Sequence, residues 1–90
     1  MNSRATKGPS DFQYDPDNLL NVASLHLHAK NDAALARALD VMPPVISKIR
    51  HRHAYVSAFM LIRIHEKTSI NIGTLRELMG DRRPYFTAPV

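Results

Sequence analysis

Signals for the start of a helix recur along this chain, and they constrain its fold more than any other feature. A short polar side chain that can cap a helix stands just before an apolar stripe of helical spacing at four places, which are Asp15, Asn31, Ser57 and Asn71. The adjacent Pro43 and Pro44 mark a fifth start, because backbone N–H groups in the first turn have no partner within the helix. No alternation typical of a β-strand reaches a useful length. The sequence therefore predicts a compact all-α domain of five helices.

The apolar spacing within each segment sets the expected helix bounds and buried faces. The expected helices cover residues 16–28, 32–39 and 43–51, and two more follow Ser57 and Asn71. One face of the fourth helix is expected to carry Ala58, Leu61, Ile62 and His65. The side chains expected in the core include Ile46, Ile49, Leu61, Leu75 and Leu78.

Composition and length favour one small domain with flanking segments. The 90 residues contain 44% hydrophobic side chains and no cysteine, so neither a disulfide nor a thiolate metal site can stabilise the fold. We expect a flexible N-terminal arm over residues 1–14, a domain over 15–81 and a tail over 82–90. The longest apolar run, residues 58–62, is too short to span a membrane, and the N-terminus lacks the apolar core of a signal peptide. A cytoplasmic protein with no membrane partner is expected.

Positive charge is concentrated in the middle of the chain. The formal net charge is +4 and the isoelectric point is near 9.9, whereas residues 1–30 balance to zero. Residues 41–56 contain no acid, and their basic and histidine side chains are Lys48, Arg50, His51, Arg52 and His53. This cluster favours an acidic partner, and by itself it does not choose among nucleic acid, membrane surface and acidic protein.

Residues 32–53 have the spacing of two short helices that cross at a tight turn. Ala36 offers a small contact point on the first helix, and Val41 can plug the turn. Ile46 and Ile49 then anchor the second helix from its inner side. The outer side of that helix would carry Pro43, Pro44, Ser47 and Lys48.

The segment AALARALDVMPPVISKIRHRH resembles the helix-turn-helix of the lambda-repressor and Cro-like family, whose common pattern is LAxxLGVSxxxISxIxxG. The likeness is tight over residues 32–53 and loose over 15–80. It implies a lambda-repressor-like DNA-binding domain whose helix over about 43–51 lies in the major groove. In that family the positions of Pro43, Pro44 and Lys48 commonly face base edges. The positions that commonly meet phosphates are those of Asn31, Asp32 and His51.

Four residues depart from the family pattern. Asp40 replaces the turn glycine, and Met42 replaces a capping Ser or Thr. Asp32 stands where a neutral Gln often touches phosphate. Arg52 replaces a frequent glycine after the second helix. These departures concern individual contacts more than the fold.

The resemblance and the charge together predict a sequence-specific transcriptional regulator of double-stranded DNA, a bacterial or phage repressor that binds as a homodimer. The expected base contacts come from Pro43, Pro44, Ser47 and Lys48. The expected phosphate contacts come from Asn31, Asp32, Arg50, His51, Arg52 and His53. Because proline donates no hydrogen bond, it would read bases through thymine methyl groups. Tyr85 and Phe86 of the tail, or the fifth helix, are candidates for the dimer contact.

Other functions have weaker support in the sequence. The alternative from another class is a helix-turn-helix adaptor or antitoxin-like protein whose main partner is another protein. His26 and His28, like His51 and His53, lie two residues apart, a spacing that separates them around a helix, so no metal is expected. Ser47 lies four residues before His51 with no orienting acid, so neither an enzyme nor a cofactor nor a small-molecule substrate is expected.

Overall fold

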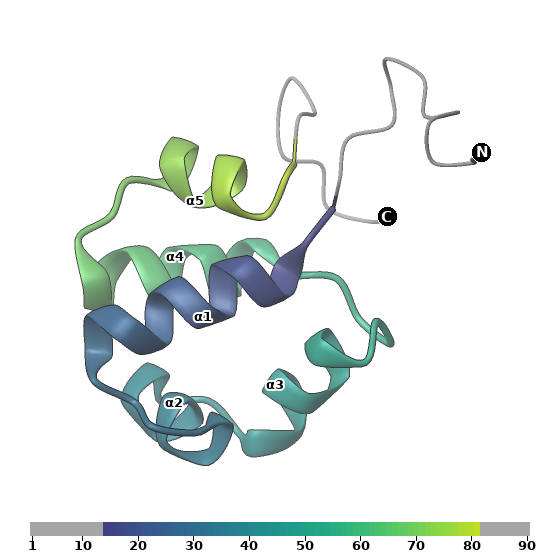
Figure 1. The fold of residues 1–90 in the computed structure, drawn as a ribbon, viewed down its shortest axis with the longest axis vertical. Coiled ribbons are helices and arrows are strands. Elements are labelled where there is room, and N and C mark those ends of the chain that lie inside the picture. Colours follow the sequence, from purple (N-terminus) through teal and green to yellow (C-terminus); the bar gives the residue numbers. More distant parts are fainter. Residues whose placement is uncertain (1–13, 82–90) are drawn as a thin grey trace.

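The computed structural model describes residues 14–81, and in this range the chain forms five α-helices and no strand (Figure 1). The helices are α1 (Pro16–Leu27), α2 (Asp32–Leu39), α3 (Pro43–Arg50), α4 (Ala58–Thr68) and α5 (Ile72–Leu78). The predicted all-α fold of five helices is confirmed for this range. Most of the expected arm, and the expected tail with Tyr85 and Phe86, lie outside the described residues.

The helices begin where predicted because polar side chains satisfy N–H groups of the first turn. Each cap accepts a hydrogen bond from the backbone N–H three residues on, over 3.2 Å at Asp15, 2.8 Å at Asn31, 3.1 Å at Ser57 and 2.8 Å at Asn71. Helix α3 starts differently, since Met42 provides no side-chain cap. Its first two residues are prolines, which remove two of the N–H groups that would otherwise need a partner.

Helix α1 is the centre of the fold and packs against each of the other four helices. Helix α5 lies on one side of the α1 and α4 pair, and α2 with α3 lies on the other (Figure 1). Within residues 14–81, every helix is too short or too polar to cross a bilayer. One continuous apolar core joins the elements, formed by Leu19, Leu20, Ala23, Leu35, Ala36, Leu39, Ile46, Ile49, Val56, Met60, Leu61, Ile64, Leu75 and Met79.

The buried face of α4 differs from the expected one. Its buried side chains are Met60, Leu61 and Ile64, whereas Ile62 is 46% exposed. Several adjacent aliphatic residues make the stripe ambiguous by one position, and the packing of α4 against α1, α2 and α5 selects the face. Leu78, expected in the core, is only partly buried and packs against its edge.

The turn between α2 and α3 tolerates an aspartate where the family pattern has glycine. Asp40 adopts the left-handed backbone conformation, with φ 59° and ψ 46°, which aspartate accepts more readily than most residues. Arg63 of α4 supports this turn because its Nη1 donates to the carbonyl oxygens of Leu39 at 2.8 Å and Asp40 at 3.1 Å. A cation at the C-terminal end of α2 also complements the helix dipole.

Candidate nucleic-acid interface

Helix α3 is held against the rest of the domain from one side only. Ile46 and Ile49 are buried at 0% and 2% exposure, in the same core as the small contact residue Ala36 of α2. The N–H of Val41 donates to the carbonyl of Ala36 at 2.9 Å, which closes the turn between the two helices. Val41 itself is partly buried against the core. The predicted inward anchors of the helix-turn-helix are therefore confirmed.

The opposite side of α3 faces solvent. Each of the four residues predicted to contact bases is exposed, namely Pro43, Pro44, Ser47 and Lys48. They occupy positions i, i+1, i+4 and i+5, so the helical period brings them onto one face. The structure thus presents them on one accessible surface.

The chain turns back directly after α3 and exposes three further side chains predicted to contact phosphate. The carbonyl of Lys48 accepts hydrogen bonds from the N–H groups of His53 and Ala54, at 2.8 and 3.2 Å. His51, Arg52 and His53 are all exposed in this turn. Arg52 has φ 63°, the left-handed region that glycine enters freely, which accounts for the glycine of the family pattern at this position.

The ring of His51 has a fixed hydrogen position. Its Nδ1 lies 2.9 Å from the carbonyl oxygen of Ser47 and 3.4 Å from the Ser47 hydroxyl. Because a carbonyl oxygen only accepts, Nδ1 carries the hydrogen, and Nε2 is left for an external partner. Nε2 can donate to a phosphate only when the ring is protonated. Among residues 14–81, no group of three or more His, Asp or Glu side chains is arranged to hold a metal ion.

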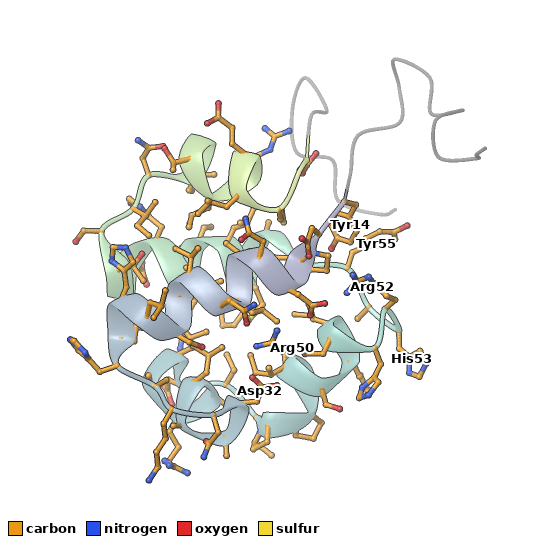
Figure 2. The ribbon with its side chains drawn as sticks, viewed as in Figure 1. Tyr14, Asp32, Arg50, Arg52, His53 and Tyr55 are labelled. Carbon is orange, nitrogen blue, oxygen red and sulfur yellow. The ribbon has the colours of Figure 1, made fainter. Side chains whose placement is uncertain are left out.

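Arg50 and Asp32 were both predicted to contact phosphate, and the structure pairs them with each other (Figure 2). The Nε and Nη2 atoms of Arg50 donate to the two carboxylate oxygens of Asp32 at 3.0 and 2.9 Å. The hydrogen bonds to Asp32 raise the pKa of Arg50 above its ordinary value. The side chain of Arg50 is 23% exposed, so it is far less accessible than its place in a basic cluster suggests.

Asp17 of α1 completes this ion-pair network, and the sequence gave no indication of its role. Its carboxylate accepts from Nη1 of Arg50 at 3.2 Å and from Nη1 of Arg52 at 3.3 Å. An acid in the first turn of a helix is common because it complements the helix dipole, so Asp17 carried no distinguishing signal. Its partners lie 33 and 35 residues away in the chain, beyond the reach of any local pattern.

Asn31 stands at the start of α2 with half of its side chain engaged. The Oδ1 atom caps the helix by accepting from the N–H of Ala34, and the residue is exposed. The side-chain amide nitrogen keeps its two hydrogens for donation, which suits the phosphate contact predicted for it.

Comparisons with family models, with curated proteins and with solved structures found no match for this chain. The likeness to the lambda-repressor and Cro-like family therefore depends on the motif in residues 32–53 and on the five-helix layout around it.

Proposed function

We propose that this protein is a sequence-specific double-stranded DNA-binding transcriptional regulator, a repressor of the lambda-repressor-like kind, with α3 in the major groove. The observation that carries the proposal is the two-sidedness of α3. Ile46 and Ile49 are buried, whereas the face formed by residues 43, 44, 47 and 48 is exposed. The major groove is about 12 Å wide and admits a helix presented in this way.

Base reading is assigned to the exposed face of α3. Pro43 and Pro44 offer only apolar surface, which suits the methyl group of thymine. Lys48, one turn further on, can donate to the two acceptors of a guanine in the major groove. Ser47 can donate to or accept from a base, although its carbonyl and hydroxyl also lie close to His51.

Phosphate binding is assigned to exposed side chains on both flanks of α3. Asn31 lies at the start of α2, and His51, Arg52 and His53 follow the end of α3. Arg50 is assigned a different part, because Asp32 and Asp17 accept three of its hydrogen bonds. It holds the end of α3 against α1 and α2 and so sets the orientation of the base-reading face.

A homodimer follows from the small size of one reading surface. Two copies related by a two-fold axis would read an inverted repeat, with half-sites about 34 Å, or one helical turn of DNA, apart. Footprinting of a bound operator tests this arrangement, because a single unsymmetrical half-site would contradict the dimer. A bacterial or phage repressor of this kind would act in the cytoplasm.

Salt-dependent binding to duplex DNA tests the proposal. If each subunit neutralises three or four phosphates, the log–log slope of affinity against salt for a dimer should be about −5 to −7. The variant Lys67→Gln removes an exposed cation of α4 outside the proposed interface and should leave this slope unchanged. A slope near zero for the wild-type chain would reject binding in the groove.

Exposed apolar side chains favour a second candidate, a helix-turn-helix adaptor or antitoxin-like protein that binds another protein. Met42, Phe59 and Ile62 are exposed at 69%, 57% and 46%. An adaptor would show weak DNA binding without sequence preference at physiological salt. Retained affinity with a preferred sequence under the same conditions favours the regulator.

A further inference from the structure

A hollow of about 190 Å³ lies between the start of α1 and the turn that follows α3. We call it the loop hollow. Its lining residues are Tyr14, Arg52, His53, Ala54 and Tyr55 (Figure 2). Pockets for drug-sized molecules usually measure about 300–1,000 Å³, so this hollow suits a small group rather than a whole organic ligand.

One wall of the loop hollow is a pair of tyrosines with unequal environments. The ring centroids of Tyr14 and Tyr55 are 5.4 Å apart and the rings are tilted by 59°. The hydroxyl of Tyr14 accepts from the N–H of Val56 at 3.2 Å, which leaves its own hydrogen to donate. In the described part of the chain no acceptor for that hydrogen is present. Burial raises the pKa of Tyr14, so the hydroxyl stays protonated and able to donate.

Arg52 forms the cationic side of the loop hollow. Only its Nη1 is engaged, with Asp17 and with the carbonyl of Arg50, both at 3.3 Å. The side chain is 48% exposed, and the hydrogens on Nε and Nη2 remain for another acceptor. The backbone N–H of Tyr55 also donates no hydrogen bond within residues 14–81.

These side chains share one chemical property, which is an excess of donors. The lining contains a guanidinium, an imidazole and two hydroxyls, and it contains no carboxylate. Asp17, the nearest acid named here, is already shared between Arg50 and Arg52. A ligand that matches such a lining is small, anionic and rich in acceptor oxygens.

We propose that the loop hollow binds a phosphate oxyanion, with Arg52 and the hydroxyls of Tyr14 and Tyr55 as its donors. Because this rests on the proposed function, the expected source is a backbone phosphodiester of bound DNA, and a free phosphate is the other source of the same chemistry. The hollow follows the last turn of α3, where the strand that borders the groove would pass. Two tyrosines far apart in the sequence would thus fix the phosphate that registers α3 along the duplex.

The test with DNA replaces one backbone phosphate at a time by an uncharged methylphosphonate. At one position in each half-site, the replacement should weaken binding by the wild-type chain about five- to tenfold, as expected for a hydrogen bond to a charged group. The same replacement should cost Arg52→Gln and Tyr55→Phe less than twofold, because these variants have already lost donors to that phosphate. Lys67→Gln serves as the matched control and should behave as wild type. Tyr55→Phe keeps the test valid if Tyr14→Phe, which loses the contact with Val56, fails to fold.

The test without DNA titrates the full chain with inorganic phosphate and follows the NMR signals of the tyrosine rings and the arginine side chains. Saturable shifts at Tyr14, Tyr55 and Arg52 that vanish in Arg52→Gln support the site. If they occur while the wild-type chain fails to bind DNA, the site is a free-phosphate site and the proposed function is wrong. If the backbone replacement is coupled to Arg52 and Tyr55 but free phosphate causes no shift, the ligand is the DNA backbone.

The result that would overturn the site is also distinct. It is salt-dependent DNA binding in which no methylphosphonate position is coupled to Arg52 or Tyr55, with no saturable phosphate shift in the loop hollow. In that case the proposed function would stand and the phosphate site would fall. Absence of both DNA binding and phosphate binding would reject the two proposals together.

Discussion

The guanidinium of Arg50 grips the carboxylate of Asp32 at two points, through Nε at 3.0 Å and Nη2 at 2.9 Å. Arg50 is the last residue of α3, and Asp32 is the first residue of α2. The pair therefore joins the two ends of the helix-turn-helix that are farthest from its turn. A third hydrogen bond, to Asp17, extends the connection to α1. This network fixes how α3 lies on the domain, independently of the core contacts of Ile46 and Ile49.

The first prediction separates this positioning from phosphate binding. Arg50→Met should destabilise the domain by about 1 kcal/mol, because the pair has two-point geometry but is only partly shielded from water. It should reduce the preference for the operator over random DNA while leaving the salt slope nearly unchanged. Urea unfolding and salt-dependent DNA binding measure the two effects. A salt slope smaller in magnitude by about 1 would instead mean that Arg50 contacts a phosphate.

The second prediction contrasts two adjacent residues on opposite sides of α3. Ile49→Ala should lower the free energy of unfolding by about 2–4 kcal/mol, since Ile49 is buried in the core. Lys48→Ala should change it by less than about 0.5 kcal/mol, because Lys48 is exposed, and it should lower both affinity and sequence preference. Denaturant unfolding with binding to matched and mismatched duplexes checks both. Equal binding losses on all sequences would show that Lys48 does not read a base.

The third prediction uses the left-handed backbone of Arg52, whose φ is 63°. Arg52→Gly should be more stable than Arg52→Ala by about 1 kcal/mol, because a Cβ is disfavoured in that conformation and glycine is not. Both variants should weaken binding to all DNA sequences to a similar degree. Thermal unfolding gives the stability difference. If the alanine variant is the more stable one, the turn after α3 has a different backbone.

The fourth prediction concerns high pH. Burial raises the pKa of Tyr14 above its ordinary value of 10.0, so the folded state holds the hydroxyl proton more tightly than the unfolded chain does. That stabilisation is complete below the unfolded pKa and is lost as the pH rises from about 10 through the folded pKa. Unfolding in urea at pH 8 to 11 should show this loss for the wild-type chain and for Tyr55→Phe, and a smaller loss for Tyr14→Phe. Equal pH dependence in all three would contradict the burial of Tyr14.

Local chemistry explains why so much of the fold was predictable. Asp15, Asn31, Ser57 and Asn71 each act on a backbone N–H three residues away, so a short window of sequence contains both partners. The same is true of the prolines that begin α3. The burial of α4 was predicted less well, since Met60, Leu61, Ile62 and Ile64 are all apolar and only packing decides which of them faces outward.

The candidate site was predictable in part for the same reason. Ser47 and Lys48 lie on the outer face of α3 because the helical period puts them opposite Ile46 and Ile49. The charges of residues 48–53 were visible in the sequence, but their partners were not. Asp17 reaches Arg50 across 33 residues, and Tyr14 reaches Val56 across 42. Such contacts depend on the packed fold, so a basic cluster in the sequence cannot reveal which of its cations are free to bind DNA.

The central claim, that the outer face of α3 reads DNA bases, is tested most directly by selecting bound duplexes from a random pool. Wild type and the double variant Pro43→Gln, Pro44→Gln are compared, and the first turn of a helix tolerates either residue. The wild-type chain should enrich an inverted repeat with thymines opposite the start of α3 and a guanine near Lys48, and the double variant should shift the preference toward adenine at the thymine positions. An unchanged selected sequence, or no enrichment by the wild-type chain, would contradict the claim.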